Sequence, residues 1–160
     1  MREDAAVATL ASVALIVFAM AVVYTSASRA AQQGTLSGFP VGNATLVHNG
    51  VSNSYLVYLA ETPSLQEQGY MNSTTLGNCN SSPSRCLGMV FPFNNYGQLC
   101  FWMENTRIPL KQVWFNLSDQ ATYIYNATPY STQAICHDGL FVLETSTNQS
   151  ISIGDKLTFS

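Results

Sequence analysis

Charged residues are scarce in this 160-residue chain, where Asp, Glu, Lys and Arg together make up only 9% of the sequence. An average soluble protein has roughly 25%. Beyond residue 31 the basic side chains are few and scattered, namely Arg85, Arg107, Lys111 and Lys156. Four isolated cations cannot neutralise a row of phosphates, so we do not expect a nucleic acid partner. The carboxylates are also too few for an acidic coat, and the surface should be polar but nearly neutral.

The compact motifs of common enzyme and metal sites are also missing. The sequence has no Gly-rich phosphate loop, no serine in a nucleophile-elbow context and no His/Glu pair at helical ligand spacing. Its cysteines include no Cys-x₂-Cys pair, which disfavours zinc. The thioethers of Met71, Met89 and Met103 would suit copper(I), but methionines in apolar segments are more often core residues. We predict no metal and no cofactor.

One long apolar run is present, at residues 5–24. Twenty helical residues at about 1.5 Å each span a hydrocarbon core of about 30 Å, which predicts a transmembrane anchor. The alternative is a cleaved signal peptide, with Ser28 and Ala30 as small residues at the cleavage site. The run is longer than the apolar region of a typical signal peptide and little positive charge precedes it, which favours the anchor.

Two features beyond this run favour an exterior, oxidising location for the rest of the chain. Four cysteines lie there, and we predict the bridges Cys79–Cys86 and Cys100–Cys136, which contribute at most about 2.5 and 4 kcal/mol through chain entropy. Six glycosylation sequons lie there as well, although an Asn-, Ser- and Thr-rich chain also produces sequons by chance. These are Asn43, Asn72, Asn80, Asn116, Asn126 and Asn148.

We therefore divide the chain into an anchor with its flanks (1–31), a tether (32–38) and an exterior domain (39–160). This is the organisation of a single-pass cell-membrane glycoprotein that contacts the membrane through residues 5–24 and has its C-terminal domain outside.

Short strand signals dominate residues 39–160. The Asn49-Gly50 turn joins segments 44–47 and 54–60 into a predicted hairpin. Thr62 and Pro63 are an N-cap and an N1 proline, so a short helix should run from 64 to about 70. Further strands are predicted at 89–93, 99–104, 111–117, 121–126, 140–145 and 150–159. This spacing predicts a mainly β (α+β) domain, a compact antiparallel β-barrel or sandwich with one short helix.

Several motifs resemble a known family. The longest is Phe101-Trp102-Met103-Glu104-Asn105-Thr106-Arg107-Ile108-Pro109-Leu110, and the others are Gly69-Tyr70-Met71, Gly88-Met89-Val90-Phe91, Ala127-x-Pro129, Val142-Leu143-Glu144 and Gly154-Asp155. Together they resemble the domain-of-unknown-function 192 family, also called the uncharacterised protein family 0127, over about residues 54–159. The resemblance implies a small β-rich fold with one short helix, often exported or membrane-tethered, and no established activity. Asn72 and Lys111 depart from residues that are common in the family.

The candidate site is the segment Trp102, Glu104, Asn105 and Thr106, which combines an aromatic plane with acceptor, amide and hydroxyl groups that suit a glycan or a peptide. Strand alternation through 99–104 places Leu99, Phe101 and Met103 on the core face and Cys100, Trp102 and Glu104 on the other. The alternative interpretation is that Trp102 fills the core and that Asn105 and Thr106 merely end a strand.

Two functions are therefore expected. The first is a membrane-anchored extracytoplasmic accessory or ligand-binding module with a cell-envelope glycan or protein partner. The second is a surface hydrolase or transferase in which Glu104 shares acid/base work with His137 and Asp138. The alternative for this last pair is an exposed loop without a catalytic role.

Overall fold

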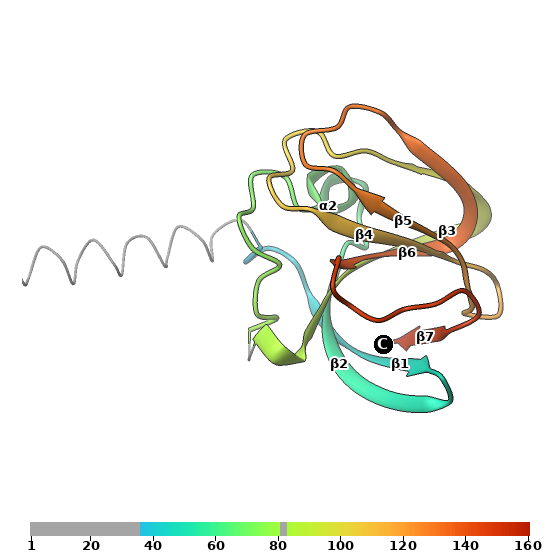
Figure 1. Cartoon of the computed structure of the whole chain (residues 1–160). Helices are drawn as coiled ribbons and strands as arrows, with labels where there is room; N and C mark the ends of the chain where they lie inside the picture. Colours follow the sequence, from blue (N-terminus) through green and yellow to red (C-terminus); the bar gives the residue numbers. More distant parts are fainter. Residues whose placement is uncertain (1–35, 81–82) are drawn as a thin grey trace, which may run out of the picture. The chain divides into compact units, whose positions relative to one another are not determined.

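The computed structural model describes residues 36–80 and 83–160 (Figure 1). The predicted anchor at 5–24 lies outside the described residues. Within the described part of the chain, no helix combines the length and the apolar character that a membrane crossing requires.

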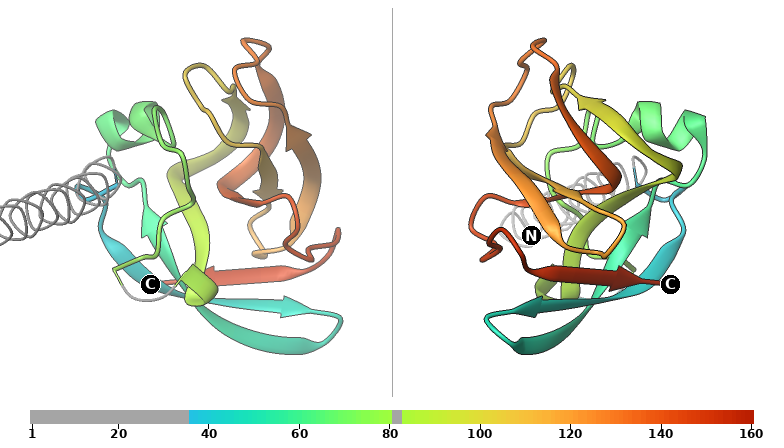
Figure 2. Two further views of the ribbon diagram at one scale, coloured as in Figure 1. Left: turned by 60° about the vertical axis from the view of Figure 1, so that its left-hand side comes forward. Right: turned by 90° about the vertical axis from the view of Figure 1, so that its right-hand side faces the viewer.

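The domain is built on a seven-stranded sheet with the strand order β5-β4-β6-β3-β2-β1-β7. Its strands are β1 (Val41–His48), β2 (Val51–Leu59), β3 (Cys86–Phe101), β4 (Leu110–Phe115), β5 (Ala121–Ala127), β6 (Ile135–Ser146) and β7 (Lys156–Phe159). The sheet curls into a half-barrel, so that its two edge strands approach each other (Figure 2). An isolated bridge pairs Gln120, just before β5, with Lys156 at the start of β7.

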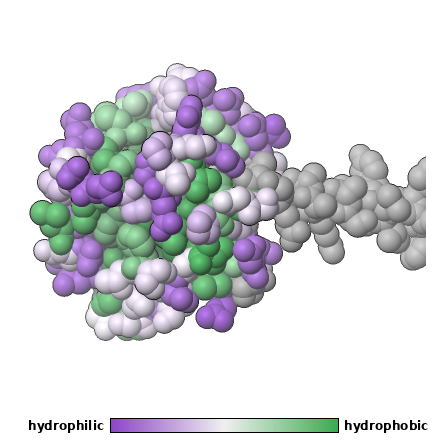
Figure 3. Space-filling model, turned by 180° about the vertical axis from the view of Figure 1, so that it is seen from behind, coloured by the Kyte–Doolittle hydropathy of each residue, from purple (hydrophilic) through white to green (hydrophobic). Residues whose placement is uncertain are grey.

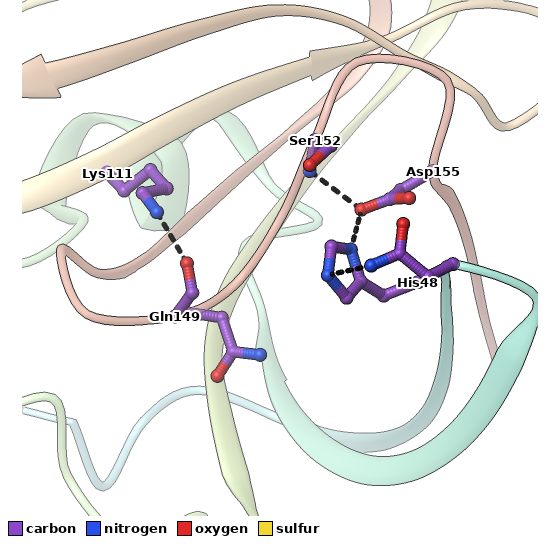
Figure 4. A network of polar contacts seen from close by, with 6 residues as sticks. His48, Lys111, Gln149, Ser152 and Asp155 are labelled. Carbon is purple, nitrogen blue, oxygen red and sulfur yellow. Dashed lines mark hydrogen bonds and ion pairs between the residues drawn. The ribbon is translucent and has the colours of Figure 1, made fainter.

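A hydrogen-bonded turn holds this closure in place. The Asp155 carboxylate accepts the backbone N–H of Ser152 at 2.7 Å and contacts Nδ1 of His48 at 2.6 Å (Figure 4). The backbone carbonyl of Asp155 accepts the N–H of Ala121 at 2.8 Å. The Gly154-Asp155 motif therefore has a structural role, because it ties β1 and β5 to the turn before β7.

The mainly β fold with one short α-helix is confirmed for the described residues, but the expectation of a purely antiparallel fold is wrong. Strands β2 and β3 pair in parallel. Parallel neighbours need a crossover connection. That crossover contains α2 (Pro63–Gln68), followed by the Cys-bearing insertion and the single 3₁₀ turn η1 (Pro83–Arg85).

Several predicted boundaries also differ from the structure, and three of the differences change how the chain is interpreted. Strand β3 runs through both predicted strands 89–93 and 99–104 as far as Phe101, because a register shift between Pro92 and Gly97 keeps it paired with β6. Residues 150–155 form the turn described above, so only the second half of the predicted strand 150–159 is a strand. His137 and Asp138, expected in a loop, lie within β6.

The central strands are buried on both faces. Met89, Phe91 and Trp114 belong to one apolar cluster, which we call the helix-side core because Leu65 of α2 packs against it. Their neighbours Val90 and Val113 belong to a second cluster, on the opposite face of the sheet. Two-sided burial explains why these strands read as continuous apolar runs.

The short helix α2 is fixed at both ends. Its N-cap Thr62 accepts the N–H of Leu65 at 3.3 Å, as the sequence predicts. At the other end the N–H of Gly69, which has a positive φ of 42°, bonds to the carbonyl of Leu65. The side-chain amide of Gln66 donates to the carbonyl of Pro92 at 2.8 Å, which attaches the helix to β3.

The surface matches the scarcity of charge in the sequence. In the view of Figure 3, apolar and polar residues are interleaved over one face of the domain. Several large apolar side chains are more than 45% exposed, namely Val51, Tyr96, Trp102, Leu117, Tyr130 and Ile153. Singly exposed apolar residues are common in soluble domains, so exposure by itself marks no site.

Candidate functional site

A cavity of about 260 Å³ lies between the C-terminal end of α2, strand β3 and the segment 102–106. Its lining includes residues from four of the motifs that carried the family resemblance. The lining residues are Gln66, Glu67, Gln68, Gly69, Tyr70, Met71, Phe91, Phe93, Cys100, Phe101, Trp102, Glu104, Thr106 and Glu144. Carboxylates and aromatic rings dominate this set, and it includes no lysine, arginine or histidine.

Phe101 organises the aromatic wall. Its ring makes edge-to-face contacts with Phe91 at 5.0 Å, with Trp114 at 5.9 Å and with Phe93 at 6.5 Å between centroids. Such pairs contribute beyond simple burial because the positive edge of one ring meets the negative face of the other. The wall is therefore packed against the helix-side core, whereas Trp102 at the rim is 49% exposed.

Glu144 is the most buried carboxyl of the cavity, with only 4% of its surface exposed. It lies on β6, opposite Gln112 of β4 and Met89 of β3 in register. The amide nitrogen of Gln112 donates to Oε1 of Glu144 at 2.9 Å. Burial raises the pKa of Glu144 from 4.5 to about 7, and this hydrogen bond lowers it only in part. Near neutral pH the carboxyl can therefore hold or release a proton.

The polar pair of Glu144 and Gln112 is incompletely satisfied. The other amide atom of Gln112, Oε1, is buried and has no hydrogen-bond partner in the described part of the chain. Buried polar atoms of native proteins nearly always have partners, and exceptions call for an explanation such as a functional role. The unsatisfied acceptor therefore draws attention to Gln112, which does not line the cavity itself but bonds to Glu144, which does.

Backbone packing fixes the position of Glu144. Gly88 on β3 has φ of 151°, and an added Cβ there would lie 2.0 Å from the carbonyl oxygen of Glu144. Only glycine permits β3 to approach β6 so closely at this point. The glycine of the Gly-x-Val-Phe motif therefore has a direct structural link to the buried carboxyl.

Tyr70 is a second buried group of the cavity that sequence reasoning overlooked. Its pKa lies well above its usual value of 10, first because of burial and second because of the neighbouring Glu144 carboxylate. The phenol donates to the carbonyl of Leu76 at 3.4 Å, so it is held as a neutral group. Tyr70 and Glu144 belong to motifs of the family resemblance but are not among the residues that the sequence predicts for the site. The signal in the sequence that could have identified Glu144 as a site residue is a lone carboxylate at the end of an apolar strand segment.

Three of the four predicted ligand residues line the cavity, and the fourth does not. Trp102, Glu104 and Thr106 line the cavity. Asn105 does not line it, and instead adopts a left-handed conformation with φ of 55° while its carbonyl accepts the N–H of Asn72 at 2.8 Å. Leu99 and Met103 are buried, Phe101 is partly buried and Trp102 is exposed, which agrees with the predicted alternation.

His137 and Asp138, the predicted acid/base partners of Glu104, are not among the residues that line the cavity. The ring of His137 stacks on Tyr123 of β5 at 4.5 Å with an interplanar angle of 7°. Asp138 is exposed and lies opposite Gln98 in register. The structure does not unite these two residues with Glu104 in one pocket.

Both predicted disulfides are present. Cys79 is bonded to Cys86, and Cys100 is bonded to its cross-strand partner Cys136. Cys100 lines the cavity, so the second bridge fastens the Trp102 end of β3 to β6.

The three methionines considered for copper have different surroundings. Met89 and Met103 are buried in the helix-side core, whereas Met71 lines the cavity.

Five of the six sequon asparagines are exposed, namely Asn43, Asn72, Asn80, Asn126 and Asn148. Asn116 differs because its Oδ1 accepts the N–H groups of Ser118 and Gln120 and so shapes a turn. Whether any sequon carries a glycan stays a prediction.

A second cavity of about 330 Å³ is lined by Pro92, Phe93, Asp119, Leu140, Phe141, Thr158 and Phe159. Its lining includes one carboxylate, Asp119, and no buried carboxyl comparable to Glu144. The cavity beneath Trp102 therefore offers more chemistry and is the better candidate site.

Comparisons with known proteins support the fold. The family model described as DUF192, Uncharacterized ACR, matches residues 44–159. A proposed transcription regulator from Sinorhizobium meliloti 1021 is 26% identical with a TM-score of 0.66, covering 76% of this chain and 95% of its own. A protein of unknown function from Novosphingobium aromaticivorans DSM 12444 is 29% identical with the same TM-score, covering 77% of this chain and 88% of its own. No curated protein matches the chain.

Proposed function

This chain belongs to the DUF192 family, and from that premise we propose that it is an extracytoplasmic ligand-binding module whose site is the cavity beneath Trp102. The observation that carries the proposal is the buried carboxyl of Glu144 in the lining of a cavity whose rim carries an exposed tryptophan. Ligand sites are typically concave and largely apolar, with a few convergent polar groups. This cavity has that composition.

The aromatic rings and the carboxyls of the cavity have different roles in this proposal. Phe93 and Phe101 offer apolar surface, and Trp102 offers an indole plane at the entrance. Glu104 and Glu144 are acceptors at different depths, since Glu104 is partly exposed and Glu144 is buried. A small group of a glycan or a peptide would be oriented by the carboxyls and held by the rings.

We further propose that the module is tethered to the cell membrane through residues 5–24 and glycosylated on its exterior face. The apolar run, the two disulfides and the sequons support this. Protease added to intact cells should then remove residues 39–160, and treatment with a glycosidase should lower the apparent mass. A domain that resists protease until the cells are lysed would contradict the topology.

The binding site itself can be tested by nuclear magnetic resonance, because the chain has only two tryptophans. Trp114 is fully buried and donates its indole N–H to the carbonyl of Leu99 at 3.0 Å. Ligands in the cavity should shift the indole signal of Trp102 and leave that of Trp114 unchanged. Probes are a set of monosaccharides and of capped amino acids, and Trp102→Phe assigns the two signals.

A matched control distinguishes binding in the cavity from non-specific contact with exposed aromatic side chains. Measured by isothermal titration calorimetry, which does not need the Trp102 signal, Trp102→Ala should abolish the binding of any probe that shifts this signal in the parent chain, whereas Tyr96→Ala should not. Tyr96 is 46% exposed and lies outside the lining. Equal losses in the two variants would point to non-specific contact with exposed aromatic rings and would contradict the proposal.

A second candidate function, a surface hydrolase or transferase, is favoured by one observation. Glu104 and Glu144 line the same cavity in contrasting environments, since Glu104 is partly exposed whereas Glu144 is buried and its pKa is raised to about 7. Two carboxyls in contrasting environments can act as a proton donor and as a carboxylate, the pair that many hydrolases and transferases use. Release of nitrophenol from nitrophenyl glycosides or esters, lost in both Glu104→Gln and Glu144→Gln, would favour this function.

A further inference from the structure

We propose that the cavity beneath Trp102 binds the basic side chain of a peptide, a lysine or arginine whose cation reaches the carboxyl of Glu144. This inference rests on the proposed function and specifies the chemistry of its ligand. It follows from the charge of the lining, from the hydrogen bonds that the lining already makes and from the order of its groups with depth.

The charge of the lining has one sign. Glu67, Glu104 and Glu144 line the cavity, and no basic residue does. Figure 4 shows two basic residues of the domain engaged elsewhere, with Lys111 bonded to the carbonyl of Gln149 and His48 in contact with Asp155. Arg107 follows Thr106 along the chain but is exposed and outside the lining. A cation entering the cavity therefore meets no competing cation from the lining.

Most neutral polar side chains of the lining already have partners. Gln66 donates to the carbonyl of Pro92, Thr106 bonds to the carbonyl of Glu104 and Tyr70 bonds to the carbonyl of Leu76. Gln68 also has a partner. A sugar ring, with hydroxyls on all sides, would find few free donors and acceptors. The groups left for a ligand are the carboxylates and the aromatic faces.

The order of these groups fits a long side chain with a terminal cation. Trp102 stands at the exposed rim, Phe101 and Phe93 are partly buried and Glu144 is the most buried carboxyl. The apolar stem of lysine or arginine would lie along the rings while its head reaches the acid. A cation near an aromatic face also gains from the ring quadrupole, most strongly with tryptophan.

The unsatisfied Oε1 of Gln112 fits the same picture. Gln112 is 1% exposed and bonds Glu144 through its nitrogen, so its oxygen is an acceptor without a donor next to the carboxyl. Glu144 lines the cavity and Gln112 does not, so a ligand that brings N–H donors to the carboxyl would add to the bond that Gln112 already makes with it. A ligand that brings only acceptors would not.

The test is a titration of the full chain, followed through the Trp102 indole signal, with two probes that differ in one group. Nα-acetyl-lysine methylamide carries the ammonium, and Nα-acetyl-norleucine methylamide lacks it. The lysine probe should bind at least about tenfold more tightly, because a charge-assisted hydrogen bond is worth that much or more. Glu144→Gln should remove the preference, and Glu104→Gln should reduce it.

Charge-matched controls and further probes complete the design. Glu61→Gln makes the same change in net charge at an exposed site outside the lining and should leave the affinity within about twofold. The arginine analogue should also bind. Affinity for the lysine probe should rise with pH through the titration of Glu144, with Glu67, Glu104 and Tyr70 as the other titratable groups of the lining.

The outcomes separate this inference from the proposed function. Equal binding of the lysine and norleucine probes, or binding of glucosamine in preference to the lysine probe, would overturn the basic side chain as ligand and leave the cavity as a binding site. Failure of every probe, charged or neutral, to shift the Trp102 signal would overturn both.

Discussion

Replacing Glu144 with glutamine should change how the stability of the domain depends on pH. The carboxyl is buried, and its pKa rises from 4.5 to about 7 on folding. Below pH 4.5 it is protonated in both the folded and the unfolded chain. Between 4.5 and 7 the folded chain keeps a proton that the unfolded chain releases, so the free energy of unfolding falls as pH rises through this window. Above pH 7 the carboxyl is ionised in both states, and the free energy of unfolding no longer falls on its account.

The size of the effect follows from the two pKa values. At about 1.4 kcal/mol per pH unit, the interval from 4.5 to about 7 corresponds to about 3 kcal/mol. Glutamine at position 144 can still accept from Gln112 but carries no titratable proton. Its stability curve should therefore be flatter, and near pH 8 the variant should be more stable than the parent chain.

Urea unfolding at pH 4, 5.5, 7 and 8, followed by the fluorescence of the buried Trp114, would measure this difference. Glu61→Gln is the control, since Glu61 is exposed. Parallel stability curves for the parent chain and Glu144→Gln between pH 4.5 and 7.5 would refute the assignment of Glu144 as the group that titrates near neutrality.

Two further predictions concern the wall and the backbone of the site. Phe101→Ala should cost about 3 kcal/mol in the free energy of unfolding because it removes three ring contacts, whereas Trp102→Ala should cost less than about 1. Equal losses in urea would make Trp102 a core residue. Gly88→Ala should cost more than about 3 kcal/mol, because the new Cβ would meet the Glu144 carbonyl at 2.0 Å. Gly97→Ala, which meets nothing within 4 Å, is its control, and similar melting temperatures would contradict the steric argument.

Local signals in the sequence were reliable wherever the chemistry is local. The Thr62 cap, the Asn49-Gly50 hairpin turn and the alternation around Trp102 depend on neighbouring residues, and each was predicted correctly. The disulfide partners were also predicted correctly, because the short loop from Cys79 to Cys86 left one remaining pair.

Non-local features could not be predicted in the same way. The parallel pairing of β2 with β3 depends on where the crossover returns the chain, which no local pattern records. His137 and Asp138 were expected in a loop before a strand at 140–145, but pairing with β3 extends β6 through them. Glu144 was overlooked because its importance comes from burial under α2 and from Gln112, which lies 32 positions away in sequence.

The surroundings of Glu144 are difficult to explain by stability alone. An apolar side chain at this position would extend the helix-side core without desolvating a carboxyl, and replacement of buried polar groups by apolar ones is often neutral or stabilising. The present arrangement raises the pKa of Glu144 and leaves Oε1 of Gln112 without a donor. Local rules of folding are broken most often at functional sites. Because the carboxyl also lines a cavity between an aromatic wall and an exposed tryptophan, a donor that enters from outside would offset the cost of burying the carboxyl, and a cation would do so most strongly.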